Sequence, residues 1–380
     1  MKIINKISQI ILKSKFRFSK PRQSKTVIYD VQSEKYLKPF FKEDEYFILF
    51  TRYEEINLYI ILKLIFKFKK VNLVNYLSEL IDAIKPKIVI TFIDNDVGFY
   101  KLKKLQKNTI FIAVQNGTRF VTGDFLSFLS KNKDIFEIDH YFIFNDCYGQ
   151  QIGKYIKSNF ITIGSLKNNI HNIKNSIKPR SLCYISRMSN IFFDYAKVLD
   201  VKKIKSNYEK WEIELLHYTL TLLANISKYC EKNEIKLNIL GASQNFDLEE
   251  KFFKNIFKKN TFNFLKKTSL YNSYKNIDQF SVAINAMSTF GYEAIARKKK
   301  VCFFSGDFIE GSNFLWPISN LKKGNFFTNS NNLNEVTRIL DYLLNLQEKV
   351  WCQEIEEYNK KLFFYDEGNN KFKNFIKKLV

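Results

Sequence analysis

The sequence predicts an α/β protein built from two Rossmann-like domains that face a cleft. Short apolar runs, rich in Ile, Val and Phe and of strand length, recur along the chain. Segments of helix length separate most of these runs, which is the pattern of parallel sheets covered by helices on both faces. The alternation pauses once, at a polar stretch near the middle, and then starts again. We therefore expect two doubly wound parallel sheets, one in each half of the chain.

The first half, residues 1–165, is expected to form the N-terminal domain. Six of its apolar runs are bounded by polar or turn-forming residues, as buried strands are. We expect strands at 25–31, 46–51, 87–94, 109–115, 140–145 and 160–164, and helices at 56–68, 73–84, 98–106 and 148–156.

The polar stretch "LKNNIHNIKNSIKPRS", residues 166–181, is the expected linker, and residues 182–380 are the expected C-terminal domain. In that domain we expect strands at 182–187, 236–241, 262–265, 279–286 and 301–305, and helices at 211–231, 248–257, 292–297, 333–347 and 349–363. The terminal helices are candidates for packing back on the N-terminal domain.

The composition narrows the class of protein. The formal charge is +23, yet only eight of the 61 basic residues are Arg, and no nucleic-acid-binding motif is present, so we expect no nucleic-acid partner. A solvated lysine-rich surface, or a surface facing anionic lipid, explains the charge. Five dispersed cysteines and three dispersed histidines predict a reducing, cytoplasmic location and no metal site.

The segment 1–20 is basic and apolar, without the long apolar core of a signal peptide or a membrane span. On a helix its isoleucines would share one face, opposite several lysines. Two interpretations stay open: a peripheral helix at the inner face of the cytoplasmic membrane, or an ordinary first helix packed on its domain.

Polar residues follow several strands of the first half. In parallel sheets, ligands bind beyond the carboxyl ends of the strands. A mixture of carboxylate, amide and guanidinium groups suits a hydroxyl-rich substrate such as a sugar, although each carboxylate alone is more often a helix cap. The candidate substrate-binding residues are Glu55, Asn95, Gln115, Asn116, Arg119 and Asp124, and the candidate catalytic bases are Asp94 and Asp96.

The second half carries small polar turns at its strand ends, above all "MSTFGYEA", residues 287–294. A helix N-terminus offers unpaired N–H groups and a positive dipole end to phosphate, and a carboxylate in the first turns can accept hydrogen bonds from ribose. The candidate residues for binding a nucleotide are Ser165, Arg187, Gly241, Ser243, Ser288, Thr289, Gly291 and Glu293. In a chain that favours Lys, an Arg beside a strand end, such as Arg187 or Arg297, can mark a site that needs a planar fork.

The stretch "STFGYEAIARKKKVCFF" resembles the nucleotide-sugar site of GT-B glycosyltransferases, except that Lys298 stands where Gly is common. The segments "VQSEKYLKPFF", "TRYEEINLYIILK", "VITFIDNDVGFYKLKK" and "IGSLKNN" resemble a family of bacterial surface carbohydrate biosynthesis proteins. The resemblance implies a metal-independent GT-B enzyme that moves a sugar from a nucleotide-sugar co-substrate, with no other cofactor, to a growing capsule, lipopolysaccharide or similar glycan. The C-terminal domain would hold the donor and the N-terminal domain the acceptor.

Two alternatives stay open. One is a polyol-phosphate transferase of teichoic-acid type, for which His140 and His171 are the candidate residues, although neither lies in a matching motif. The other is a non-catalytic glycan-binding or assembly protein, which would have no use for a phosphate-binding turn.

Overall fold

The computed structural model describes residues 14–119, 125–131, 135–171, 177–258, 261–269, 271–307, 313–316, 318–319 and 321–379. Most of the predicted amphipathic segment, residues 1–13, and the candidate Asp124 lie outside these ranges. The chain divides by its internal contacts into two units. Unit 1 comprises residues 1–116, 132–166 and 369–380, and unit 2 comprises residues 117–131 and 167–368.

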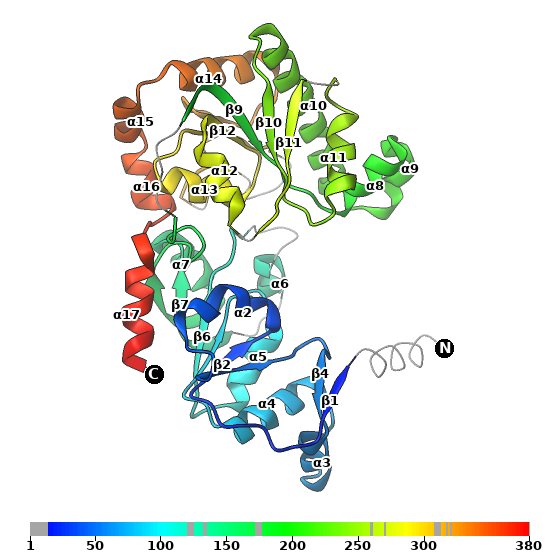
Figure 1. The fold of residues 1–380 in the computed structure, drawn as a ribbon, viewed down its shortest axis with the longest axis vertical. Helices are drawn as coiled ribbons and strands as arrows, with labels where there is room; N and C mark the ends of the chain where they lie inside the picture. Colours follow the sequence, from blue (N-terminus) through cyan, green and yellow to red (C-terminus); the bar gives the residue numbers. More distant parts are fainter. Residues whose placement is uncertain are drawn as a thin grey trace. The chain divides into compact units, whose positions relative to one another are not determined.

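Unit 1 contains a six-stranded, wholly parallel sheet in the order β3-β2-β5-β6-β7-β8 (Figure 1). Its strands are β2 (Thr26–Tyr29), β3 (Tyr46–Leu49), β5 (Ile88–Thr91), β6 (Ile110–Val114), β7 (Phe136–Ile143) and β8 (Ile156–Thr162). Its helices are α2 (Val31–Leu37), α3 (Leu58–Phe66), α4 (Leu73–Ile84), α5 (Val97–Leu105), α7 (Asp146–Ile152) and α17 (Asn370–Leu379). All six strands were expected from the sequence.

A separate, short parallel pair in unit 1 joins β1 (Lys15–Arg17) to β4 (Glu55–Asn57). All three residues of β1 are exposed, so the apolar pattern that reveals buried strands is missing here. This pair was not expected, and it places Glu55 in a strand outside the six-stranded sheet.

The core of unit 1 includes α17, which is more than 200 residues from most of its neighbours in sequence. Phe372 is fully buried in the same cluster as Ile28, Ile90 and Phe142. Its ring lies 5.0 Å from that of Phe142, edge to face. Residues 370–379 thus complete the N-terminal core, and this helix was not among those expected from the sequence, the last of which ends at residue 363.

Unit 2 contains a second six-stranded parallel sheet in the order β11-β10-β9-β12-β13-β14 (Figure 1). Its strands are β9 (Lys178–Ile185), β10 (Leu237–Leu240), β11 (Phe262–Leu265), β12 (Phe280–Asn285), β13 (Val301–Phe304) and β14 (Phe327–Thr328). Its helices are α6 (Phe125–Lys131), α8 (Asn190–Val198), α9 (Val201–Ile204), α10 (Lys210–Lys232), α11 (Phe246–Lys254), α12 (Asn272–Asp278), α13 (Thr289–Ala296), α14 (Leu333–Asn345), α15 (Glu348–Glu354) and α16 (Glu356–Leu362).

The polar stretch expected to be the linker is partly buried in its described residues, 166–171 and 177–181, and it enters a strand. Asn168 and Asn169 are fully buried, and β9 begins at Lys178, inside the expected linker. Asn169 accepts two hydrogen bonds from residues far along the chain, from the Gly368 N–H to its carbonyl (2.6 Å) and from the Asp366 N–H to its side chain (3.1 Å). Buried amides need such partners, and polarity alone does not distinguish them from solvated linker residues.

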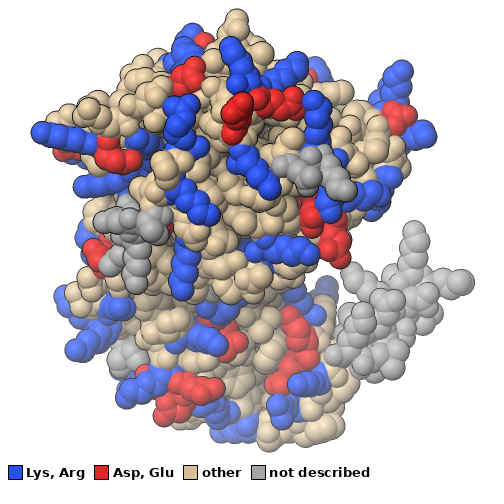
Figure 2. Space-filling view, turned by 45° about the horizontal axis from the view of Figure 1, so that its top comes forward, with Lys and Arg blue, Asp and Glu red and all other residues tan. Residues whose placement is uncertain are grey.

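Basic side chains are spread over the surface. On the face drawn in Figure 2, Lys and Arg lie scattered, with Asp and Glu among them, and do not gather into one stripe. This distribution fits the expectation of a solvated lysine-rich surface on that face. Within the described residues, no helix is both long enough and apolar enough to cross a membrane.

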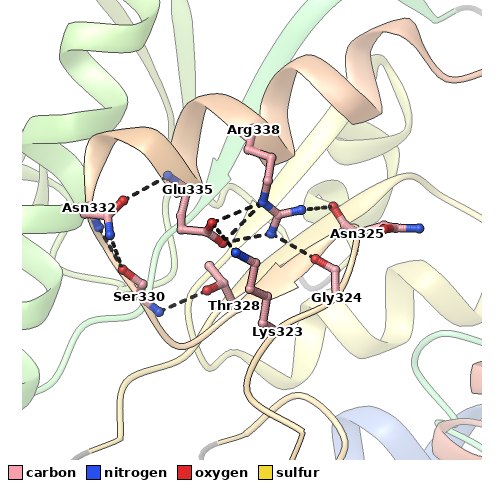
Figure 3. Close-up of polar contacts among 8 residues, drawn as sticks. All are labelled: Lys323, Gly324, Asn325, Thr328, Ser330, Asn332, Glu335 and Arg338. Atoms are coloured by element: carbon pink, nitrogen blue, oxygen red, sulfur yellow. Dashed lines mark hydrogen bonds and ion pairs between the residues drawn. The ribbon is translucent and has the colours of Figure 1, made fainter.

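One charged network fastens the start of α14 to the segment before it (Figure 3). Asn332 caps α14 by accepting a hydrogen bond from the Glu335 N–H (2.9 Å). The Glu335 carboxylate pairs with Arg338 (2.8 Å) and with Lys323 (2.8 Å). Hydrogen bonds from Arg338 in particular hold the pKa of Glu335 at about 2. Arg338 also donates to the Gly324 carbonyl (2.9 Å), which ties residues 323–328 to the helix.

A second charged cluster leads to a test of stability. The Glu79 carboxylate, which is not exposed, receives the ammonium groups of Lys63 (2.8 Å), Lys67 (2.6 Å) and Lys69 (3.4 Å). Burial alone would raise the pKa of Glu79, but the hydrogen bonds from Lys63 and Lys67 outweigh it and hold the pKa at about 2. A carboxyl whose pKa is lowered on folding stabilises the fold above its unfolded pKa. That contribution is lost as the pH falls through the folded pKa.

Glu79→Gln is therefore expected to lower the free energy of unfolding by about 2 kcal/mol at pH 7, since a hydrogen bond to a charged group contributes about that much. The difference from the wild type should shrink as the pH falls from 4.5 toward 2. Urea unfolding across this range measures both effects. Glu357→Gln, at an exposed pair with Lys360, is the matched control and should change little. A constant difference at every pH would contradict the assignment.

Candidate functional site

The sheet of unit 2 has a topological switch point between β9 and β12. The chain proceeds outward from β9 through β10 to β11, and then returns to place β12 on the other side of β9. In open α/β sheets, ligands bind beyond the carboxyl ends of the strands at such a point. Here the loop after β9 carries Arg187 and the loop after β12 carries Met287. The Arg187 guanidinium donates to the Met287 carbonyl (3.4 Å), which links the two loops.

Helix α13 begins at this switch point. Ser288 is its N-cap, and the Ser288 hydroxyl accepts a hydrogen bond from the Phe290 N–H (3.3 Å). Asn285, the last residue of β12, accepts a hydrogen bond from the Ser288 N–H (3.2 Å) and so fixes the turn. The helix starts at Thr289, three residues before the start expected from the sequence. Its amino terminus is a site of positive potential at the carboxyl edge of the sheet.

Gly291 was expected in the turn before the helix, where it would let phosphate approach the backbone. It lies instead inside the first turn of α13 and is buried. A Cβ atom at this position would lie 2.7 Å from the Cβ of Asn285 and closer still to its side-chain amide. The absence of a side chain is therefore required for packing against Asn285, and a role of Gly291 toward phosphate stays a prediction.

The segment after β6 lies against the start of α13. The Thr289 hydroxyl accepts a hydrogen bond from the Thr118 N–H (3.0 Å) and lies 3.0 Å from the Thr118 hydroxyl. Residues 117–131 belong to unit 2 by their contacts, although they fall within the first half of the sequence. Arg119, which was assigned to the acceptor side, is nearly buried and its guanidinium lies close to Gly117. The structure thus brings this loop together with the predicted phosphate turn.

Glu249, on α11, joins the loops after β9 and β10. Its fully buried carboxylate accepts hydrogen bonds from the Ser186 hydroxyl, the Ala242 N–H (3.0 Å) and the Ser243 N–H (2.9 Å). Gly241 is crowded by Phe264, 2.9 Å from where a Cβ would be. The candidates Gly241 and Ser243 are therefore at the expected strand end. The Ser243 backbone, however, is fixed by Glu249, a residue that the sequence analysis did not single out.

Glu293, in α13, is almost fully buried. It is 1% exposed, its Oε2 accepts a hydrogen bond from the Tyr274 hydroxyl (2.6 Å), and its Oε1 lies 3.6 Å from the Lys167 ammonium. The ring of His171 stacks on that of Tyr274 at 4.5 Å. Burial, with the positive charges nearby, lowers the pKa of His171 to about 4, so this imidazole is neutral at neutral pH.

Arg297, at the end of α13, contacts the residues around Tyr274 from several sides of its guanidinium group. The residue is 2% exposed. Its guanidinium pairs with Asp278 (2.7 Å) and donates a hydrogen bond to the Asn168 side chain (2.8 Å). It also lies over the Tyr274 ring at 5.6 Å, within range of a cation–π interaction. The sequence offered a signal for this residue, an Arg in a lysine-rich chain, but gave no indication of its partners.

In unit 1, the two candidate bases have structural contacts. Asp94 is not exposed, and its carboxylate accepts hydrogen bonds from the Tyr141 hydroxyl (2.7 Å) and the Asn116 N–H (3.2 Å). Asp96 is half-buried and caps α5 through the Gly98 N–H (2.8 Å), while its second oxygen accepts from the Tyr29 hydroxyl (2.8 Å). Of the two, Asp96 is the more accessible.

The other candidates of unit 1 are dispersed. Gln115 is almost fully buried and accepts a hydrogen bond from the Phe144 N–H (2.9 Å), while Asn95 is exposed. Glu55 pairs with Arg17 (3.0 Å) in the small β1–β4 sheet. Ser165, assigned to the donor, is buried and belongs by its contacts to unit 1. Glu55 therefore lies in a sheet apart from the strand ends that carry the other described candidates of unit 1.

Asp30 lies at the switch point of the first sheet, between β2 and β5, and was taken for part of a strand. It is almost fully buried, has a φ of 69° and caps α2 through the Gln32 N–H (2.7 Å). Its other oxygen accepts from the Thr51 hydroxyl (2.6 Å) and lies 3.3 Å from Arg52 Nε.

Within the described residues, no group of three or more His, Cys, Asp and Glu side chains is arranged to hold a metal ion.

The two parallel six-stranded sheets with their helices define the two-Rossmann-domain fold of GT-B glycosyltransferases and UDP-GlcNAc 2-epimerases. The UDP-GlcNAc 2-epimerase of Methanocaldococcus jannaschii matches with a TM-score of 0.53 at 9% identity, over 94% of this chain and 100% of that chain. Sucrose-phosphate synthase of Thermosynechococcus elongatus matches with a TM-score of 0.50 at 11% identity, over 94% of this chain and 99% of that chain. At these identities the likeness concerns the fold alone.

A chain of the GtfA/B complex also matches, with a TM-score of 0.48 at 12% identity and 82% of this chain covered; this chain spans 61% of its length. No curated protein matches the sequence. The family model described as "putative O-antigen biosynthesis protein" matches residues 112–380. The chain belongs to this O-antigen biosynthesis family, and the expected relation to surface carbohydrate biosynthesis is confirmed.

Proposed function

We propose that the protein is a glycosyltransferase that moves a sugar from a nucleotide-sugar donor to a growing surface glycan. This glycan would be O-antigen, another part of lipopolysaccharide, capsule or a similar polymer. The observation that carries the proposal is the switch point of unit 2, where Arg187, the Ser288 cap and the start of α13 lie together. Family membership in O-antigen biosynthesis supports the substrate class. Unit 2 would bind the donor, and unit 1 would bind the acceptor.

The proposed chemistry depends on stabilising the departing nucleoside diphosphate. Negative charge develops on this group as the glycosidic bond to the donor breaks. The N–H groups at the start of α13 and the Arg187 guanidinium can stabilise that charge without proton transfer. A base must take the proton of the acceptor hydroxyl if the anomeric configuration is inverted. Asp96 is the better candidate, because Asp94 is fully buried.

Arg187→Ala is expected to weaken the binding of the nucleotide about ten- to hundredfold, since a hydrogen bond to a charged group contributes about 1.5–3 kcal/mol. Calorimetric titration with UDP, GDP and CMP and their sugar conjugates measures this loss. It also shows which nucleotide the protein binds. Arg180→Ala is the matched control, because Arg180 is an exposed arginine near the start of β9, at the opposite end of the strand from Arg187. Equal affinities of Arg187→Ala and the wild type would exclude the switch point as the donor site.

In the proposal Glu293 accepts hydrogen bonds from the ribose hydroxyls while Tyr274 holds its other oxygen. Donor binding would then displace Lys167, whose ammonium lies 3.6 Å from Oε1, longer than a hydrogen bond. Glu293→Gln is expected to lower nucleotide affinity about ten- to hundredfold. Tyr274→Phe keeps the carboxylate and should lose less. Unchanged nucleotide affinity in a folded Glu293→Gln protein would leave this residue with a structural role only.

Product analysis separates transfer from other chemistry on the same fold. A glycosyltransferase needs an acceptor and releases the nucleotide, whereas an epimerase converts the nucleotide sugar without an acceptor. Asp96→Asn should slow transfer while nucleotide affinity stays near that of the wild type. The polyol-phosphate alternative has little support, since His171 stacks on Tyr274, and His140, on β7, packs against Phe375 of α17. Turnover of a CDP-polyol would nevertheless establish it.

A further inference from the structure

An exposed apolar and basic surface lies at the end of α3 in unit 1. Residues 65–72, "IFKFKKVN", are all exposed. Within this run Phe66 is 80% exposed and Phe68 is 98% exposed, and Ile65 and Val71 are each 53% exposed. Single exposed apolar residues are common on proteins, but several contiguous ones mark an interaction surface. We call residues 62–71 the α3 tip.

The helix itself is firmly anchored. Ile60 and Leu64 are fully buried, and α3 packs against α4. Asn57 caps its start by accepting a hydrogen bond from the Ile60 N–H (3.3 Å). Phe66 and Phe68 are therefore exposed although the helix that precedes them is well packed.

The charge around the α3 tip is positive. The ammonium groups of Lys63, Lys67 and Lys69 share the single carboxylate of Glu79, which leaves positive charge in excess. Lys70 adds a further exposed lysine in the same run. A surface that combines exposed aromatic rings with lysines is complementary to an anionic lipid headgroup layer over hydrocarbon.

The neighbouring strand pair extends this character. β1 contacts α3, and Phe18, which follows β1, is 73% exposed beside the exposed Lys20. Figure 1 shows α3 beside β1 and β4, at the edge of unit 1. Phe16 and Lys15 of β1 are exposed as well. Apolar and basic side chains thus continue from the α3 tip onto the adjacent element.

We propose that the α3 tip docks unit 1 on an anionic membrane surface, with Phe66 and Phe68 inserted among the headgroups and the lysines on the lipid phosphates. A membrane fits better than a protein groove. The apolar side chains stand at a protruding helix end and the turn after it, and lysines alternate with them, as in interfacial segments that insert shallowly. The inference is independent of the proposed glycosyl transfer, because it uses none of the residues assigned to donor or acceptor.

Vesicle co-sedimentation of the full chain tests the proposal. The wild type should bind vesicles containing phosphatidylglycerol and bind phosphatidylcholine vesicles weakly. Phe66→Ser with Phe68→Ser should lower the binding at least tenfold while the thermal unfolding temperature stays unchanged. The matched control is Leu321→Ser with Val350→Ser, at two residues that are 54% and 43% exposed in unit 2. This control should bind as the wild type does.

A charge variant tests whether the lysines of the α3 tip contact the lipid phosphates. Lys69→Gln with Lys70→Gln should reduce binding to phosphatidylglycerol vesicles about tenfold or more, since each lysine near an anionic surface contributes about fivefold. Lys202→Gln with Lys203→Gln, at exposed lysines of α9, is the control. The effect should disappear at high salt.

Three outcomes would overturn the proposal. Wild-type vesicle binding by the Phe66/Phe68 variant would do so directly. Loss of vesicle binding on deleting residues 2–13, with no effect of the Phe66/Phe68 change, would assign docking to that segment alone. If sedimentation shows a dimer of the wild type that the Phe66/Phe68 change dissociates, and no vesicle binding occurs, the α3 tip contacts a second copy instead. A blue-shifted Phe66→Trp fluorescence on anionic vesicles would support insertion.

Discussion

Gly291→Val is expected to lower the free energy of unfolding by about 3 kcal/mol or more, and to abolish nucleotide binding with it. The Cβ would lie 2.7 Å from the Cβ of Asn285, a separation that real side chains do not show. Both residues are buried, so α13 would have to move away from β12, and overpacking of this kind costs roughly 1–3 kcal/mol or more. Urea unfolding measures the loss.

Gly291→Ala and Asn285→Ala, alone and combined, provide the control. If the clash is the cause, the double variant should be more stable than the sum of the single changes predicts, because Asn285→Ala removes the two nearest atoms. If Gly291→Val is as stable as the wild type and loses only nucleotide affinity, the result would support the expected close approach of phosphate to the backbone at this position.

Arg297→Leu is expected to destabilise unit 2 by about 3–5 kcal/mol. The substitution leaves Asp278, which is 6% exposed, without the partner 2.7 Å away, and a buried charge that has lost its partner is costly. It also removes the hydrogen bond to Asn168 and the cation over the Tyr274 ring. Denaturant unfolding at pH 7 reports the change.

Two further variants isolate the cause. Asp278→Asn in the Arg297→Leu background should recover part of the lost stability, since the buried carboxylate is then neutral. Arg297→Lys should rescue poorly, because one ammonium cannot reproduce a planar fork that reaches both Asp278 and Asn168. Full rescue by Lys would show that charge alone matters at this position.

The buried strands could be predicted from the sequence because parallel strands covered on both faces have continuous apolar runs. β2, β5 and β12, for instance, are buried along most or all of their length. The elements that were missed lack this signal. β1 is fully exposed, and α2 is hidden because Asp30 ends the apolar run with a φ of 69° that no local pattern reveals. The early start of α13 was obscured by Gly291, a residue that usually marks turns.

The site was predictable only in part. The strand-end rule located Arg187, Ser243, Ser288 and Thr289, since it depends on topology and topology follows from the alternation of strands and helices. The partners of these residues come from distant parts of the chain. Glu249 lies 63 residues from Ser186, and Thr118 lies 171 residues from Thr289. Such pairings depend on how the elements pack in three dimensions, and one sequence carries no local trace of them.

The interleaving of the two units sets the order in which the protein can form during synthesis. Domains that are continuous in sequence can fold one after the other as the ribosome makes them. Unit 1 cannot finish in this way, because its core includes Phe372 and Ile376, which are made only after residues 167–368 of unit 2. Until then the surface around Phe142 and Phe40 lacks the aromatic ring that covers it. A nascent N-terminal half is consequently a candidate for chaperone binding, and its protection from proteolysis should arise only once α17 has been translated.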